Sequence, residues 1–309
     1  MSKYTVVILT FNEEANIENC LNSIAQLQAP VFVVDSYSTD RTLDILEQRG
    51  INYVQHPFSN YSAQRNWAQA NIPSPTEWVL HLDAGETATP AMVNWINNSF
   101  APESSDVDGY MFARRAIFLG RWIKYGGYHP IYHLRLYRRS LGHCEAKVYD
   151  QHFVVDGVKK IAAKGADMED GVMSSLRDFT VAHARWAVFE AVELILSEED
   201  SGEVEARFMG TPIERTRWLK NNVFQKVPLF VRSFLYLFYR YFIKLGFLDG
   251  TEGLIFHFLQ GFWFRFLVDS TIYEIKLETR TKPLAEVVMD KYGLDVNVFL
   301  NHAGPDDGE

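Results

Sequence analysis

The sequence has little cysteine and lacks two common nucleotide-binding signatures. Only two of its 309 residues are cysteines, Cys20 and Cys144. One possible pair in so long a chain is not a disulfide framework, so we expect a reducing compartment. Neither G-x-G-x-x-G nor G-x-x-x-x-G-K-[ST] occurs. Their absence argues against a dinucleotide-dependent enzyme and against a P-loop enzyme.

The sequence shows neither the pattern of a leader peptide nor that of a membrane-spanning helix. The first ten residues form a short apolar run without a basic leader or a small-residue cleavage site. We therefore expect the protein to start and remain on the cytoplasmic side. Neither of the two helices expected over 220–244 and 253–275 has the roughly 20 uninterrupted apolar residues of a spanning helix. The formal net charge of −9 argues against a general nucleic-acid binder, so no nucleic-acid partner is expected.

Charge and aromatic residues are concentrated in one part of the chain. Between Arg207 and Lys282 there are twelve Lys or Arg and six Asp or Glu, a net charge of +6, which leaves −15 for the rest. The same segment holds 18 of the 44 aromatic residues. A basic, aromatic-rich segment on an acidic protein indicates a specialised surface.

The N-terminal half alternates strand-like and helix-like segments. Tyr4 to Thr10 is a continuous apolar and β-branched run, as in strands buried on both faces. Further strands are predicted over residues 31–35, 51–55 and 77–82, and helices over 15–26, 41–49 and 62–70. This alternation predicts the α/β class, with a Rossmann-like, mostly parallel sheet and helices on both faces.

Three polar clusters follow predicted strands, where ligands bind in open α/β sheets. They begin at Thr10, Asp35 and Asp83. Asp35 suits hydrogen bonds to a ribose or a uracil ring, and the alternative is a cap on the next helix. Asp83 suits Mg²⁺ or Mn²⁺ against a pyrophosphate, with a turn carboxylate as the alternative. Glu86 is either a second metal ligand or part of the helix that begins at Pro90.

Motifs in a fixed order resemble family 2 glycosyltransferases of the GT-A fold. They are T-F-N-E-E from Thr10, V-V-D-S-Y-S-T-D from Val33, S-A-Q-R-N-W-A from Ser62 and W-V-L-H-L-D-A-G-E from Trp78. The strings F-L-G-R-W-I-K-Y-G-G (118–127) and H-L-R-L-Y-R-R (133–139) resemble a narrower branch, the bacterial lipopolysaccharide core β-glucosyltransferases. The resemblance covers about residues 4 to 186.

The resemblance implies a nucleotide-sugar site and a divalent metal, Mg²⁺ or Mn²⁺. It implies that the nucleotide base and ribose meet Thr10, Asn12, Glu13 and Asp35, with Ser38 in the same cluster. It implies Arg65 near the diphosphate and Asp83 at the metal, with Glu86 as a further ligand. Relatives usually read D-A-D-E where this chain has D-A-G-E, so Gly85 removes one expected carboxylate.

Three further roles follow from the resemblance and from residue chemistry. An inverting transfer needs a base for the acceptor hydroxyl, and Asp150 is the candidate, with Glu145 as the rival. His183 is predicted to complete the metal or pyrophosphate site, and a structural histidine is the alternative. Arg135 and Arg138 are the best placed of several arginines to clamp phosphates.

The basic, aromatic segment predicts helices that lie in a membrane interface. Helices are expected over 220–244 and 253–275, each interrupted by polar residues. Aromatic rings favour that depth, and basic residues favour anionic headgroups. The alternative is a helical pair packed on the catalytic domain or in a dimer interface. We divide the chain into a catalytic domain (1–205), a membrane-interface region (206–285) and a tail (286–309).

The sequence thus predicts an inverting glycosyltransferase with a nucleotide-sugar donor and a lipid-linked saccharide acceptor. The enzyme is expected to lie peripherally on the inner face of the cell membrane. One alternative is a polyprenyl-phosphate glycosyltransferase, whose phosphate acceptor needs no base. Another is a catalytically silent nucleotide-sugar-binding protein. The oligomeric state is left open.

Overall fold

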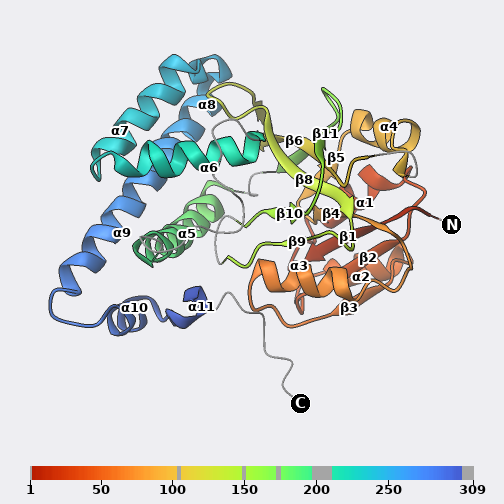
Figure 1. Ribbon diagram of the computed structural model, residues 1–309, viewed down its shortest axis with the longest axis horizontal. Helices are drawn as coiled ribbons and strands as arrows, with labels where there is room; N and C mark the ends of the chain where they lie inside the picture. The colour runs from red at the N-terminus through yellow and green to blue at the C-terminus, as the bar shows by residue number, and fades with distance from the viewer. Residues whose placement is uncertain (1, 103–105, 148–150, 172–174, 197–210, 301–309) are drawn as a thin grey trace. The chain divides into compact units, whose positions relative to one another are not determined.

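The computed structural model describes residues 2–102, 106–147, 151–171, 175–196 and 211–300 (Figure 1). These residues form two compact units. The first unit contains residues 1–116, 130–145 and 152–171, and the second contains residues 117–129, 146–151 and 172–309. Asp150, the predicted base, lies outside the described residues.

Four parallel strands form the heart of the first unit. They are β1 (Tyr4–Thr10), β2 (Val31–Asp35), β3 (Tyr53–Gln55) and β4 (Trp78–Asp83), in the order β3-β2-β1-β4. The intervening helices are α1 (Ile17–Ile24), α2 (Thr42–Gln48) and α3 (Tyr61–Ala70), and α4 (Pro90–Asn98) follows. The predicted alternation is confirmed, with boundaries within about two residues for most elements.

Later strands extend this sheet with antiparallel pairs. β8 (Ile131–Arg138) lies antiparallel to β4, and β6 (Gly109–Phe118) lies antiparallel to β8. β5 (Glu86–Ala88) pairs with β12 (Asp167–Gly171), and β11 (Lys159–Ile161) pairs with β6. A separate hairpin joins β9 (Gly142–Cys144) to β10 (Phe153–Val155). Glu86 therefore lies in a strand and not in the first turn of the helix at Pro90.

Alternate side chains of the parallel strands point to opposite faces of the sheet. Val6, Ile8 and Leu80 are fully buried on the face covered by α1, α2 and α4. The helix α3 and the β9–β10 hairpin cover the other face (Figure 1). Because helices pack on both faces, the parallel strands read as continuous apolar runs, which is why the sequence revealed them.

The second unit is mostly helical. Its strand β7 spans Arg121–Ile123, and its main helices are α5 (Leu176–Leu196), α6 (Pro212–Asn222), α7 (Val231–Phe238), α8 (Gly250–Phe256), α9 (Phe264–Glu278), α10 (Leu284–Tyr292) and α11 (Asn297–Leu300). Between them lie short 3₁₀ segments, η2 (Phe224–Lys226) and η4 (Gly246–Asp249). Two π-helical segments, η3 (Tyr239–Ile243) and η5 (His257–Trp263), continue α7 and α8.

The prediction of one helix over 220–244 is wrong for the first third of that range. α6 ends at Asn222, and regular helix resumes only at Val231. Pro228 lies in the break, since proline disfavours helical backbone at the residue before it and cannot donate an N–H. Phe230 has a positive φ of 68°, which no continuous helix allows. The second expected helix is confirmed and is longer, because α8, η5 and α9 run together from 250 to 278.

The second unit has its own core, built from helices on both sides of the predicted domain limits. Val192 of α5 packs with Ile275 of α9 and Val288 of α10. α5 was assigned to the catalytic domain and α10 mostly to the tail, but both contribute to the second unit. The limit near 205 falls outside the described residues. Within those residues, every helix is too short or too polar to cross a membrane.

Candidate active site

Two arginines and two carboxylates meet at the carboxyl end of β4. Asp83 ends β4, Glu86 opens β5, Arg65 comes from α3 and Arg135 from the middle of β8. Arg65 Nη2 donates to Asp83 Oδ2 at 3.0 Å and to Oδ1 at 3.3 Å. Arg135 Nη2 lies 2.5 Å from Glu86 Oε1 and 3.6 Å from Asp83 Oδ2. We call these four residues the arginine–carboxylate cluster.

Three members of the cluster are largely buried, and the fourth is partly exposed. The exposed fractions of the side chains are 6 % for Arg135, 5 % for Glu86 and 12 % for Arg65, against 35 % for Asp83. Asp83 is thus the member that a ligand can reach. The backbone N–H of Asp83 also donates to Glu86 Oε2 at 3.0 Å, which ties the strand end to β5.

The two carboxylates of the cluster have different proton affinities. Burial alone would raise the pKa of Asp83, but the charges of Arg65 and Arg135 outweigh it and hold the pKa at about 2. Burial raises the pKa of Glu86 to about 7, against the charge of Arg135 and with help from the charges of Asp83 and Asp170. At neutral pH Asp83 is therefore ionised, and Glu86 titrates.

Several polar atoms at this end of the sheet have no hydrogen-bond partner among the described residues. Arg135 Nε and Nη1 and Arg65 Nε are buried and unpartnered, as is Thr10 Oγ1 at the end of β1. Both guanidinium groups lie over the ring of Phe153, at 5.3 Å for Arg65 and 5.9 Å for Arg135. Buried donors are rarely left unpaired, so this end of the sheet has donor capacity in excess of its acceptors.

The loops after β1 and β2 are joined by side-chain hydrogen bonds. Asn12 has a φ of 55°, and its Oδ1 accepts the Thr39 N–H at 2.8 Å while its own N–H donates to Ser38 Oγ at 2.8 Å. Ser38 in turn donates from its N–H and Oγ to the Asp35 carboxylate. The structure therefore brings Asn12, Asp35 and Ser38 together, as expected from strand ends.

The Asp35 carboxylate is more buried, and has more hydrogen-bond partners inside the protein, than a carboxylate that only binds a ligand would need. Its side chain is fully buried, and besides Ser38 it accepts from Gln55 Nε2 at 3.0 Å. These bonds join the loop after β2 to Asp35. The N-cap residue of the next helix, α2, is Arg41, and that helix has no side-chain cap. The contact of Asp35 with a ribose or base stays a prediction. Glu13 lies in the loop after β1, and burial raises the pKa of its carboxyl.

Arg138 and His183 make contacts that differ from those predicted for them. Arg138 lies at the far end of β8, where it pairs with Glu77 and Asp108 and covers the ring of Trp78. His183 belongs to the second unit: its Nδ1 lies 2.8 Å from Phe179 O, and its ring stacks on Phe179. That environment matches the structural alternative for His183.

Glu145, the rival base, is fully buried. Its Oε1 accepts the His152 N–H at 2.9 Å and lies 3.2 Å from His152 Nδ1. Glu145 comes directly after β9, and these contacts join it to His152, which lies just before β10.

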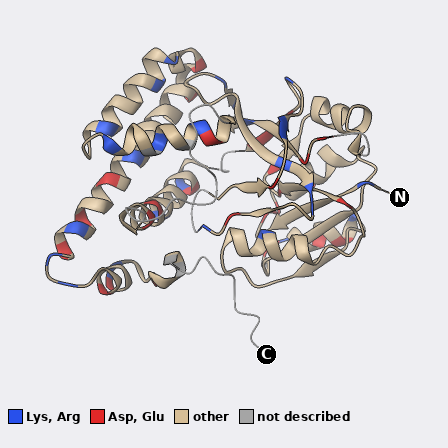
Figure 2. Cartoon of the chain, in the orientation of Figure 1, with Lys and Arg blue, Asp and Glu red and all other residues tan. Residues whose placement is uncertain are grey.

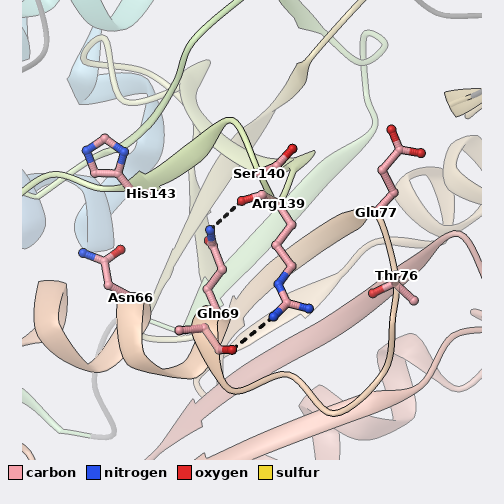
Figure 3. Close-up of a pocket in the computed structure, with 8 residues that line it drawn as sticks. Asn66, Gln69, Thr76, Glu77, Arg139, Ser140 and His143 are labelled. Atoms are coloured by element: carbon pink, nitrogen blue, oxygen red, sulfur yellow. Dashed lines mark hydrogen bonds between the residues drawn. The ribbon is translucent and has the colours of Figure 1, made fainter.

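A cavity of about 440 Å³ lies at the amino end of β4, away from the cluster. Thr76 and Glu77, just before β4, form one wall, and Asn66 and Gln69 of α3 form another (Figure 3). The backbone oxygen of Arg139 accepts from Gln69 Nε2 at 2.9 Å across it. Because ligands of parallel sheets bind at the carboxyl ends of the strands, this cavity is not the candidate active site.

The sequence reasoning missed residues that the fold brings to the site. Asp170 of β12 lies directly across from Glu86 of β5, and its Oδ2 accepts from Arg114 Nη1 at 3.1 Å. Its position depends on a strand pairing that no local pattern revealed. Phe11 and Tyr37 follow β1 and β2 and are exposed by 56 % and 53 %, although polar residues alone had been singled out there.

Residues 5–144 match the family model described as Glycosyl transferase family 2. This segment contains β1 to β4, the loops after them and all four members of the arginine–carboxylate cluster. The match supports the resemblance seen in the motifs for this part of the chain.

Curated relatives carry the same kind of name. The chain is 35 % identical over 104 residues to an uncharacterized glycosyltransferase of Rickettsia bellii, which covers 34 % of this chain and 35 % of that protein. It is 34 % identical over 106 residues to one of Rickettsia felis, covering 34 % and 37 %. The matches thus span about a third of the length of these relatives. Among solved structures, S. aureus TarS in complex with UDP is similar at 17 % identity and a TM-score of 0.41, covering 90 % of this chain and 92 % of that chain.

Proposed function

We propose that the protein is an inverting glycosyltransferase that uses a nucleotide-diphosphate sugar, with a UDP-linked hexose as the first candidate donor. The observation that carries the proposal is the arginine–carboxylate cluster, because it lies at the ligand-binding end of the sheet and inside the segment that matches family 2. The glycosyltransferase names of the relatives agree with it.

The cluster is suited to the departing diphosphate. Sugar transfer breaks the bond between C1 and the diphosphate, and negative charge develops on the leaving group. Arg65 and Arg135 have buried N–H groups without acceptors, which phosphate oxygens would satisfy. Preorganised positive groups in an enclosed site stabilise such charge strongly. Asp83 contacts both guanidinium groups and holds them in place.

The predicted Mg²⁺ or Mn²⁺ is less well matched by these side chains. Both oxygens of Asp83 face Arg65, and both oxygens of Glu86 already accept hydrogen bonds. Across the described ranges, no three His, Cys, Asp or Glu side chains are arranged to hold a metal ion. The residues present therefore do not fit a closed metal site, and we assign the stabilisation of the leaving group to the arginines.

The acceptor side of the proposal rests on the predictions made from the sequence. An acceptor hydroxyl needs a base, for which Asp150 remains the proposed residue and Glu145 the alternative. We propose a lipid-linked saccharide as acceptor, such as lipopolysaccharide core or another cell-surface glycan. Such an acceptor would meet the enzyme at a lipid surface, so association with the inner face of the cell membrane belongs to the same proposal.

A thermal-shift panel tests the donor half of the proposal. The intact protein is heated with uridine, guanosine, adenosine and cytidine diphosphates and with their hexose conjugates, with and without Mn²⁺. A ligand at about 100 times its dissociation constant should stabilise the folded protein by about 2.7 kcal/mol. We expect one nucleotide series to raise the Tm, with its sugar conjugate at least as effective as the diphosphate.

The panel also separates the alternatives. The absence of any nucleotide-dependent shift would contradict the proposed function. A nucleotide-dependent rise in Tm with no slow release of nucleoside diphosphate from the bound sugar donor would indicate the alternative, a catalytically silent nucleotide-sugar-binding protein. A polyprenyl-phosphate acceptor would tolerate Asp150→Asn in the transfer assay, whereas a hydroxyl acceptor would not.

A further inference from the structure

The outer face of α7 and η3 is apolar and exposed. Along this continuous stretch from 231 to 243, large apolar side chains recur at intervals of three and four residues, which places them on one helical face. Each is between 46 % and 59 % exposed, and they are Val231, Phe234, Leu235, Phe238, Tyr239, Phe242 and Ile243. An ordinary surface helix of a water-exposed protein turns such a stripe toward the core.

The inner face of the same stretch is polar and is held by hydrogen bonds, although Arg240 Nη2 is buried without a hydrogen-bond partner among the described residues. Arg232, Ser233 and Arg240 are buried. Arg232 Nε donates to Asp269 Oδ1 of α9 at 2.7 Å, and Ser233 Oγ donates to Asp269 Oδ2 at 3.2 Å. Arg240 Nε donates to the backbone oxygen of Gly126 at 2.7 Å. The polarity of this helix is therefore inverted, and its inward contacts fix it in that orientation.

The apolar face continues beyond α7 and η3. Leu245, Phe247 and Leu248, in and next to η4, are 44 to 45 % exposed. On the neighbouring stretch, the ring of Phe234 packs on Phe262 of η5 at 4.7 Å. Together the exposed residues of 231–248 form what we call the outer apolar face. A contiguous exposed patch of this kind marks an interaction surface.

Basic residues border this face, and acidic residues are absent from the stretch beneath it. No Asp or Glu occurs from 231 to 243 (Figure 2). Lys226 lies before the stretch and Lys244 directly after it, and both are exposed. Lys244 Nζ lies 5.5 Å from the centre of the Tyr239 ring, and exposed Lys124 lies in the loop whose Gly126 N–H bonds to Lys244 O.

We propose that the outer apolar face docks on an anionic phospholipid bilayer. Its rings would lie at the depth of the headgroups, with the lysines on the phosphates. Docking would give the enzyme access to a lipid-linked acceptor, and this benefit rests on the proposed function. The structure also narrows the membrane-interface region expected from the sequence: α9 turns Val268, Ile272 and Ile275 into the core of the second unit, so α9 does not contribute its apolar face.

Vesicle flotation tests this surface without donor or acceptor. The full chain is mixed with vesicles of phosphatidylcholine alone or with 30 mol % phosphatidylglycerol, at low and at high salt. We expect flotation with the anionic vesicles at low salt. Phe238→Glu combined with Phe242→Glu should weaken partition by about 100-fold or more, because two half-exposed rings lose burial and two charges enter the interface. Lys244→Glu should weaken it at least fivefold on anionic vesicles only.

Matched variants keep the result specific. Val181→Glu on α5 and Leu277→Glu on α9 change apolar residues of the same unit that are 64 % and 47 % exposed, and they should leave flotation unchanged. The proposal is overturned if the native protein stays at the bottom, or if the Phe238 and Phe242 variant floats as well as the native protein. It is also overturned if that variant converts a lipid-free dimer to a monomer, since a second copy would then occupy the face. Nucleotide binding in the thermal-shift panel is independent of all three results.

Discussion

The arginine–carboxylate cluster and the outer apolar face invert the usual distribution of side chains in opposite ways. In the first unit, four charged groups are withdrawn from water at the end of β4. In the second unit, apolar rings of α7 and η3 are held in water. Both arrangements cost stability when they have no partner. Each therefore indicates the chemistry of what it meets: an anion with acceptor oxygens at the first, and a lipid phase at the second.

Buried ion pairs occur at both places, in the arginine–carboxylate cluster itself and on the inner side of α7. The use that each pair makes of its donors distinguishes the two places. Arg232 Nε and Nη2 and both carboxylate oxygens of Asp269 serve contacts inside the second unit. Arg65 and Arg135 retain buried N–H groups without acceptors. A buried ion pair that is fully used holds a helix in place, whereas one with unused donors is prepared for a further ligand.

The largest effect is expected at Arg135. Arg135→Gln leaves Glu86 and Asp83 without their shared cation, and truncating one partner of a buried pair costs about 3 to 5 kcal/mol of unfolding free energy. Transfer from the donor should fall by about 100-fold or more, as for loss of one group that stabilises the leaving charge. Urea unfolding and a transfer assay measure the two losses.

Arg138→Gln is the matched control, because Arg138 lies on the same strand and pairs with Glu77 and Asp108 instead. It should change transfer by no more than about threefold, since its partners are partly exposed. Equal losses of transfer in the two variants would remove the distinction between Arg135 and Arg138. Compared with Arg135→Gln, the double variant Arg135→Met with Glu86→Leu should regain stability, but it should not regain transfer activity.

Asp269 tests the other side of the comparison. Asp269→Ala leaves buried Arg232 unpaired and should lower the unfolding free energy by about 3 kcal/mol. Since this pair serves only the inner face of α7, the folded fraction should bind donor nucleotide with unchanged affinity. Unfolding by urea and nucleotide titration at 15 °C measure both. Weakened nucleotide binding in the folded fraction would show that the pair acts beyond its own unit.

The sequence predicted those parts of the fold whose pattern is local. The parallel strands are apolar runs that end in polar residues, so β1, β2 and β4 and the gathering of Asn12, Asp35 and Ser38 could be read directly. The antiparallel additions could not. Glu86 and Asp170 are neighbours only because β5 pairs with β12, more than 80 residues apart in the chain.

The same limit explains the errors in the second half. Composition showed a basic, aromatic segment, but not which face of each helix points inward. Arg232 and Arg240 look like solvent-facing breaks in an apolar run, yet they are buried because Asp269 and the Gly126 carbonyl receive them. Arg138 was grouped with Arg135 because the two residues are three apart. Side chains alternate between the two faces of β8, however, and Arg138 lies at the far end of that strand, so the two arginines make different contacts.

The smallest effect concerns the pH dependence of the cluster. The pKa of Glu86 is raised by burial from its ordinary value of 4.5 to about 7. Between these values the folded protein binds a proton that the unfolded chain has released, so stability from this group is present below pH 4.5 and is lost as the pH rises through 7. Asp83, with a pKa of about 2, loses its stabilising contribution only under more acidic conditions.

Glu86→Gln isolates this term, because every other titrating group is common to both proteins. The unfolding free energy of the native protein minus that of the variant should fall by about 2 kcal/mol from pH 5 to pH 8. Urea unfolding at half-unit intervals of pH measures it. A constant difference would mean that Glu86 is ionised throughout and that Arg135 outweighs burial. The cluster would then carry two full negative charges against its two arginines, and the attraction proposed for the diphosphate would have to come from the unpartnered N–H groups alone.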